Sequence, residues 1–341
     1  MPRPLLLIAL LLLAAPPLAA QDPPRYTERV EVARVLVDVR AMDRGEPLLG
    51  LTTENFEVKV DGRAASVESV QWVAGALAAT DENRDPLERF LQGSAPPTAE
   101  GRLVVFLFQK SLESTRIVGF MRMLLDLRPF LDAFTPHDRL AVVSFDSRLR
   151  LWLDFTSDMD RVREVLARNL LFDGRPPEPA GESPSLFEAL GHDRASRTYS
   201  IESALQLLAA GLKPLPGAKS VVLVGHGFGR FGPGGVTMEN NYDEAREALQ
   251  DARASVFCLD VTTADYHSLE AGLQIVAEDT GGFFERTHIF GQLALQRLGA
   301  ALAGHYVLIV EKPEGKPGRH RLDVRLKGRS GTVLARRSFV D

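Results

Sequence analysis

The side chains with the clearest chemical potential in this sequence follow its apolar stretches. They are Gln109, Ser111 and Glu113 after one apolar run, Ser183 and Ser185 in a later polar loop, and His226 in a glycine-rich segment after another run. Ligands of open α/β sheets bind beyond the carboxyl ends of the strands. If the two runs are parallel strands, these amide, hydroxyl, carboxylate and imidazole groups are candidates for one shared binding site.

The residues named above do not belong to a complete catalytic motif. Gly225-His226-Gly227 is similar to the oxyanion-hole segments of esterases, but the chain has no Gly-x-Ser-x-Gly elbow and no His-Glu-x-x-His. The segment 227–232 has the spacing Gly-x-Gly-x-x-Gly, yet Pro233 and two glycines follow it instead of a helix. The sequence therefore predicts a protein that is not an enzyme and that has no cofactor.

The glycine-rich segment 225–235 also carries aromatic side chains. We expect it to be a mobile surface loop that presents Phe228 to a partner, and a plain solvent-exposed loop explains the pattern equally well.

The elements that would position these residues are strands and helices in alternation. Continuous apolar runs at 103–108, 140–145, 149–155, 220–224 and 256–261 are typical of strands covered on both faces. Helical spacing of apolar residues separates most of them. The fold class predicted for 101–304 is thus α/β, an open, doubly wound, mostly parallel sheet. Only three residues join the second run to the third, so we expect one antiparallel strand.

The two ends of the mature chain have β patterns instead. Residues 26–75 alternate apolar and polar side chains, residues 76–100 read as a linker, and residues 305–341 alternate again. One hypothesis is that 26–75 and 305–341 pack together as one small β-sandwich, with the α/β domain inserted between them.

Composition restricts the cellular setting and the partners. Residues 1–20 resemble a signal peptide, which predicts an exported protein in the periplasm, at the outer envelope or outside the cell. No later stretch is long and apolar enough to span a membrane. The net charge of −5 argues against a nucleic-acid partner. The single cysteine, Cys258, lies in an apolar run and is expected to be buried.

Basic side chains gather near the end of the chain. They are Arg319, Arg321, Arg325, Lys327, Arg329, Arg336 and Arg337. Their alternation with Leu322, Val324 and Leu326 favours a solvated sheet face, and contact with an acidic polymer or a phospholipid surface is the alternative.

Several short motifs, in their order and spacing, carry a family resemblance over nearly the whole mature chain. They are Val37-Asp38-Val39, 51–58, 138–145, 154–158, Cys258-Leu259-Asp260-Val261, 277–282 and His305-Tyr306-Val307-Leu308. With them the chain resembles a von Willebrand factor A (VWFA) domain and, more narrowly, the secreted VWFA-related proteins of acidobacteria. The resemblance implies a Rossmann-type fold that serves protein binding, and it makes Asp260 a structural residue.

The same resemblance implies a degenerate metal-ion-dependent adhesion site. The family places Asp-x-Ser-x-Ser after its first strand, a Thr in a second loop and an Asp after its fourth strand. Ser111 matches the first serine and Ser183 or Ser185 lies near the threonine, but Gln109, Glu113 and His226 depart from the pattern. Because an amide is a weak ligand for Mg²⁺ and an imidazole suits zinc or copper better, we expect no bound metal.

These observations favour an exported, non-enzymatic binding protein. Its expected contact residues for a protein partner are Ser111, Glu113, Ser185, His226 and Phe228. The alternatives are a structural or scaffolding component of an envelope complex, and an unrecognised hydrolase. The identity of the partner and the oligomeric state remain open.

Overall fold

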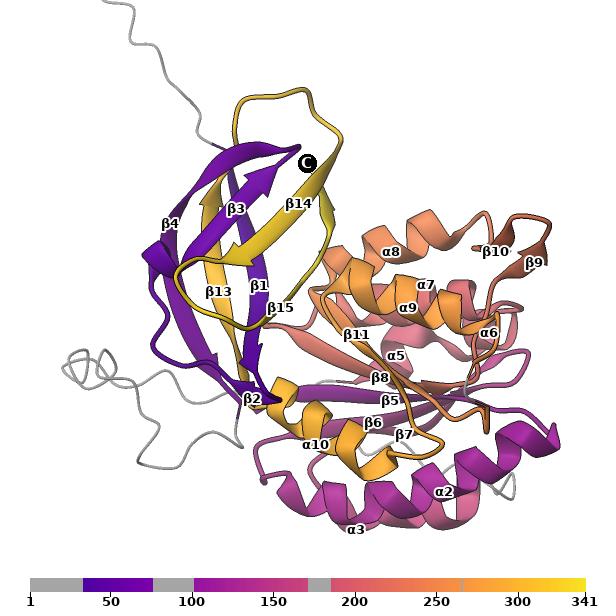
Figure 1. The fold of residues 1–341 in the computed structure, drawn as a ribbon. Helices are drawn as coiled ribbons and strands as arrows, with labels where there is room; N and C mark the ends of the chain where they lie inside the picture. The colour runs from indigo at the N-terminus through magenta and orange to yellow at the C-terminus, as the bar shows by residue number, and fades with distance from the viewer. Residues whose placement is uncertain (1–32, 76–100, 171–184, 265) are drawn as a thin grey trace, which may run out of the picture. The chain divides into compact units, whose positions relative to one another are not determined.

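The computed structural model of the chain describes residues 33–75, 101–170, 185–264 and 266–341 (Figure 1). The expected signal peptide, the expected linker 76–100 and Ser183 lie outside the described residues.

A six-stranded sheet forms the centre of the α/β part. Its strands are β5 (Leu103–Gln109), β6 (Arg139–Phe145), β7 (Leu149–Thr156), β8 (Lys219–Gly225), β11 (Ala254–Asp260) and β12 (Phe284–Arg286). Their order is β12-β11-β8-β5-β6-β7, and all neighbours run parallel except β6 and β7. The prediction of an α/β arrangement with one antiparallel strand is therefore confirmed. The strand order reverses next to β5, so the switch point lies between β5 and β8.

Helices cover both faces of this sheet, which explains why its strands are apolar runs. One face carries α2 (Ser114–Phe130), α3 (Met159–Glu164), the π-helical turn Val165–Asn169 and α10 (Gly291–Leu302). The other carries α5 (Leu186–Leu190), α7 (Ile201–Leu212), α8 (Tyr242–Asp251) and α9 (Glu270–Thr280), with α6 (His192–Ser196) beside α5 and α7. Every residue of β8 and of β11 is buried, Cys258 included, and burial raises the pKa of the Cys258 thiol.

Particular residues at the helix ends define where helices begin and stop. Asp158 is the N-cap of α3 and accepts hydrogen bonds from the backbone N–H of Asp160 and Arg161. Helix α9 ends at Gly281, which has the left-handed φ of +78° that favours glycine. The same helix begins at Glu270, and His267 lies in the turn before it.

The β segments at the two ends of the chain form one antiparallel sheet. Its strands are β1 (Arg34–Asp43), β2 (Glu46–Pro47), β3 (Phe56–Val60), β4 (Arg63–Ala74), β13 (Gly304–Glu311), β14 (Arg319–Leu326), β15 (Thr332–Ala335) and β16 (Ser338–Val340). The order is β15-β1-β13-β4-β3-β14-β16, with β2 paired to β1. Strands from both ends of the chain therefore lie next to one another in a single sheet.

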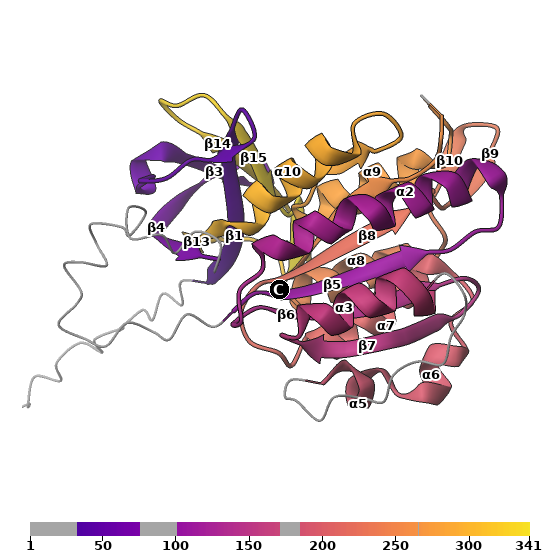
Figure 2. The same ribbon diagram turned by 90° about the horizontal axis from the view of Figure 1, so that it is seen from below.

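This sheet is strongly curled (Figures 1 and 2), and the apolar side chains on its inner side form a core of their own. The twelve-residue strand β4 pairs with β3 through its first residues and with β13 through the rest, so one hydrogen-bonded path joins all seven main strands. The hypothesis of a sandwich assumed two separate sheets, whereas the hydrogen bonds connect a single curled one. Buried Arg40 of β1 links it to the α/β part by donating to the Ala301 carbonyl and the Ser255 hydroxyl, each at 2.9 Å.

Candidate functional site

Gln109 and His226 meet at the switch point of the six-stranded sheet. The side-chain oxygen of Gln109 accepts the backbone N–H of His226 at 3.1 Å, and its Nε2 donates to the Gly227 carbonyl at 2.9 Å. Gly225 leaves room for this bridge, because a Cβ there would lie 2.7 Å from Oε1 of Gln109. Both polar atoms of the amide are thus engaged with backbone, and Gln109 braces the end of β5 against the loop after β8.

The imidazole of His226 is buried and neutral at pH 7. Burial lowers its pKa to about 4, and the charges of Arg116 and His267 lower it further in the same direction. Its Nδ1 has no hydrogen-bond partner among the described residues. A ring in this state braces the loop from inside and offers no charge to a partner.

Ser111 and Glu113 stay accessible at the same edge. The Ser111 hydroxyl accepts the backbone N–H of Glu113 at 3.3 Å, and the Glu113 carboxylate pairs with Arg116 at 3.1 Å. Between them Leu112 is 93% exposed. This short segment joins β5 to α2 and presents polar and apolar groups together.

Ser185 and Phe228 have roles different from those expected. The Ser185 hydroxyl caps α5 and donates to the buried Asp154 carboxylate at 2.6 Å. Phe228 is buried in the core beneath α9, so its ring is not presented to a partner as we predicted. The segment after it is a hairpin of β9 (Arg230–Gly232) and β10 (Gly235–Thr237), in which Phe231 is the exposed aromatic side chain.

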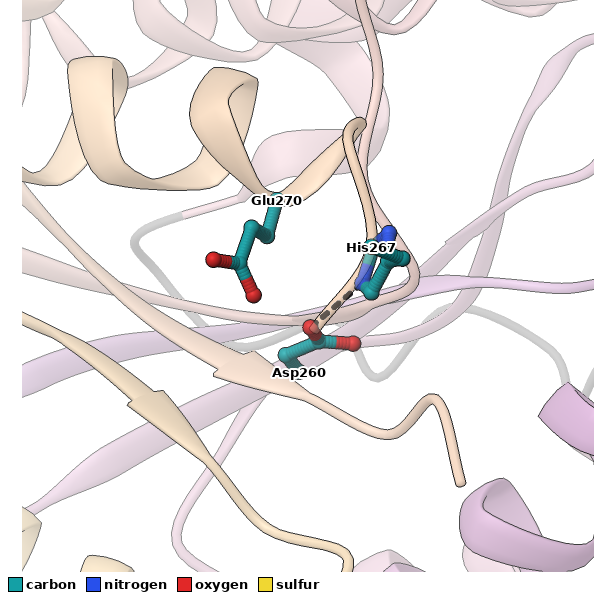
Figure 3. A group of neighbouring side chains, drawn as sticks. All are labelled: Asp260, His267 and Glu270. Atoms are coloured by element: carbon teal, nitrogen blue, oxygen red, sulfur yellow. Dashed lines mark hydrogen bonds and ion pairs between the residues drawn. The ribbon is translucent and has the colours of Figure 1, made fainter. Parts of the chain in front are cut away.

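A cluster of three possible ligand side chains lies beside this edge (Figure 3). Asp260 ends β11, His267 lies in the following turn, and Glu270 begins α9. One ligand atom from each lies within 4.8 Å of the others, and His267 Nε2 is 2.6 Å from Asp260 Oδ2. Sequence reasoning named Asp260 only as a structural residue. The i, i+3 spacing of His267 and Glu270 at a helix start was the signal that could have revealed the cluster.

The charges of this cluster are already compensated. Arg286 of β12 donates to both oxygens of Glu270, at 2.8 and 2.6 Å, and the two carboxylates of Asp260 and Glu270 are almost fully buried. The Asp260 carboxylate also accepts the backbone N–H of Thr262 at 2.9 Å. One imidazole and two carboxylates form a donor set that zinc accepts. Here the Arg286 guanidinium already neutralises the Glu270 carboxylate, to which a metal ion would have to bind. The cluster therefore joins β11, β12 and α9 as an ion-pair network.

Because of this compensation, metal ions are expected to leave the wild-type protein unchanged. At about 1 mM, neither Mg²⁺ nor Zn²⁺ should raise the melting temperature by more than about 1 °C. In Arg286→Gln, Glu270 loses its cation, and Zn²⁺ should stabilise that variant. Differential scanning fluorimetry measures both. A zinc-dependent rise in the wild-type protein that disappears in His267→Ala would contradict the expectation.

The Asp260–His267 pair also resembles half of a nucleophile-and-base arrangement. Among the described residues, no serine, threonine or cysteine side chain is hydrogen-bonded to His267. Within the described residues, this pair therefore has no nucleophile hydrogen-bonded to its imidazole, as such catalysis requires.

No helix in the described part of the chain is both long and apolar enough to cross a membrane.

Comparisons with known proteins add distant structural likenesses. No family model and no curated protein matches the sequence. An aerotolerance-related membrane protein from Bacteroides fragilis is 15% identical with a TM-score of 0.40, over 59% of this chain and 98% of that one. A von Willebrand factor type A protein from Catenulispora acidiphila is 12% identical with a TM-score of 0.41, over 88% of this chain and 75% of that one. At these scores the family and the function of the chain remain proposals.

Proposed function

We propose that this chain is an exported, non-enzymatic protein that binds another protein through an apolar face on α2 and α10. The face consists of Val118, Met121 and Leu125 of α2 with Ile289, Phe290 and Leu293 at the start of α10, each 49–64% exposed. This cluster of exposed apolar side chains is the observation that carries the proposal.

The two helices that bear the face are neighbours. Arg122 donates to the backbone carbonyl of His288, and Gln292 donates to Asp126 at 2.7 Å. Figures 1 and 2 both show α2 and α10 side by side. The six apolar side chains therefore belong to one surface of the molecule.

Helix α2 is apolar on both sides. Phe120, Met123, Leu124 and Leu127 face the core, while the three apolar residues of the apolar face are turned to solvent. Single exposed apolar residues are common, whereas a large patch of them marks a binding surface. A partner that covered this side would remove the exposure.

Two hollows border the apolar face beside Phe290. Cavities of about 460 and 420 Å³ are both lined by Phe290, one shared with Leu293 and the other with Ile289. The Phe290 ring thus borders two hollows that can receive side chains of the partner. Leu112, exposed where β5 leads into α2, extends the face toward the accessible residues Ser111 and Glu113. The exposure of Leu112 beside Ser111 and Glu113 supports the partner contacts expected at these two residues. In place of the buried Phe228, the proposed contact residues are the exposed ones of the apolar face.

The finer assignments follow from the sequence. We extend the proposal to a von Willebrand A-like, VWFA-related protein with a degenerate adhesion site, on the residues quoted above. The engaged amide of Gln109 supports a site without Mg²⁺, because its oxygen and nitrogen both bond to backbone. Residues 1–20 support export to the envelope or beyond.

Charge substitutions on the apolar face provide the test. The double variant Leu125→Glu, Leu293→Glu should leave the fold intact, because both side chains point to solvent. It should lower the affinity for the captured partner at least about tenfold. The partner is captured from envelope extract with wild-type protein, identified by mass spectrometry, purified and titrated by calorimetry. Tyr199→Glu, at an 80% exposed site on another part of the surface, is the matched control.

Two outcomes contradict the proposal. The first is a purified partner that binds the double variant and the wild-type protein equally. The second is hydrolytic activity on esterase, phosphatase or peptidase substrates that disappears in His267→Ala, which would assign catalysis to the Asp260–His267 pair.

A further inference from the structure

One cleft that the described residues line is bordered by arginine side chains from three parts of the fold. Its volume is about 750 Å³. The arginines are Arg246 of α8, Arg319, Arg321 and Arg325 of β14, and Arg336 and Arg337 between β15 and β16. The cleft lies far from the apolar face in sequence and shares no lining residue with it.

The cleft has a positive balance. Three carboxylates, Asp61, Asp279 and Asp323, line it beside six guanidinium groups, and carboxylates just outside the lining pair with some of these arginines. The lining is thus richer in positive groups than the whole chain, whose net charge is −5. Guanidinium groups that no carboxylate neutralises attract anions.

Four of the six arginines are held by acidic neighbours. Arg325 pairs with Asp323 at 2.8 Å, Arg337 pairs with Glu278 at 2.7 Å, Arg246 pairs with Asp243 at 2.8 Å, and Arg319 pairs with Glu247. These pairs orient their side chains and neutralise part of the charge.

Arg246, Arg321 and Arg336 have donors that the described residues do not use. The side chain of Arg321 is exposed and makes no hydrogen bond or ion pair with a described residue. The Nε atoms of Arg246 and Arg336 are buried and have no hydrogen-bond partner among the described residues. A buried donor without an acceptor is costly and rare in folded proteins. Acceptor atoms supplied from outside the chain would satisfy such donors.

The surroundings of Arg336 strengthen this argument. Its Nη2 donates to the Leu36 carbonyl at 2.8 Å, so the guanidinium is fixed in place. Burial removes water from this cation and lowers its pKa from the ordinary value. A fixed, partly dehydrated guanidinium beside two others forms an arrangement that recognises oxyanions by bidentate hydrogen bonds.

We infer that this arginine cleft is a binding site for an oligoanionic ligand, whose phosphate or carboxylate groups are held by Arg246, Arg321 and Arg336. The volume lies within the range of small-molecule sites and exceeds the needs of a single phosphate. Two or more linked anionic groups match the spread of the three arginines over three elements. The site is separate from the proposed protein-binding function, and neither depends on the other.

Calorimetric titration at low salt tests the inference with two probes. Tripolyphosphate represents phosphate esters and tri-galacturonate represents carboxylated sugar chains. Binding of either probe to the wild-type protein is expected, and the tighter probe identifies the source of the anionic groups. Raising the salt concentration should weaken the binding.

The decisive variant is Arg321→Gln, since Arg321 supports no other contact. This substitution should lower the affinity for the bound probe about tenfold, because a hydrogen bond to a charged group is lost. Arg148→Gln removes the same charge from the exposed turn between β6 and β7 and should change the affinity less than about twofold. Arg336→Gln is a second variant, whose folding is checked by its melting temperature. Failure of both probes to bind, or equal losses in Arg321→Gln and Arg148→Gln, would overturn the inference.

Discussion

Asp138→Ala is expected to lower the free energy of unfolding by about 3–5 kcal/mol. The Asp138 carboxylate is completely buried, accepts the backbone N–H of Arg102 and of Thr135, and forms a two-bond ion pair with the Arg102 guanidinium. Burial alone would raise the pKa of Asp138, but these hydrogen bonds lower it overall, so the group is ionised at neutral pH. Alanine would leave a nearly buried cation and two backbone donors without acceptors.

Urea unfolding followed by circular dichroism measures this loss. Asp132→Ala is the control, because Asp132 pairs with Arg163 at the surface, where an ion pair is worth less than about 1 kcal/mol. Equal losses in the two variants would show that Asp138 is not the anchor of strands β5 and β6 that its contacts describe.

Stability is expected to depend on pH through His226. The unfolded histidine has its ordinary pKa of 6.5, whereas the pKa in the folded protein is about 4. Between these values the unfolded chain binds one proton more than the folded protein, so stability falls as pH falls through this interval. The full difference is about 3 kcal/mol between pH 7 and pH 4.

In His226→Gln this part of the pH dependence should disappear, since glutamine does not titrate. The free energy of unfolding of the variant should still fall with falling pH, but less steeply. Burial also lowers the pKa of His305, which changes stability with pH in the same direction. Urea unfolding at pH 4.5, 5.5 and 7 separates the two contributions, and His137→Gln, at an exposed histidine, is the control. An unchanged pH profile in His226→Gln would contradict the buried, neutral state of this ring.

Much of the α/β architecture could be predicted from local patterns. The apolar run that predicted a strand at 220–224 became β8, and Gly281 ends α9 in the left-handed conformation that glycine favours. The three-residue link after Phe145 predicted the antiparallel β7. These features are local, because periodicity, turn length and glycine conformation act on residues that are neighbours in the chain.

The candidate site was predicted less completely. The edge residues Gln109 and His226 were identified, but the bridge from Gln109 to the loop of His226 spans 117 positions and depends on the pairing of β5 with β8. Ser185 was matched to a metal loop, yet it contacts Asp154, a strand residue 31 positions away. Phe228 lies inside the protein because the loop after β8 packs closely against Leu269 and Gly272 at the start of α9.

By itself, the sequence determined the strands and helices, the α/β class and the departure of Gln109, Glu113 and His226 from a Mg²⁺-binding pattern, because these depend on residue type and local spacing. Only the tertiary structure decided which side chains meet and which remain exposed. It joined both ends of the chain in one sheet and placed Arg286 on Glu270. It also left one side of α2 uncovered and brought six arginines to one cleft. The reason is physical: burial and ion pairing depend on how distant elements pack, and no local pattern records that packing.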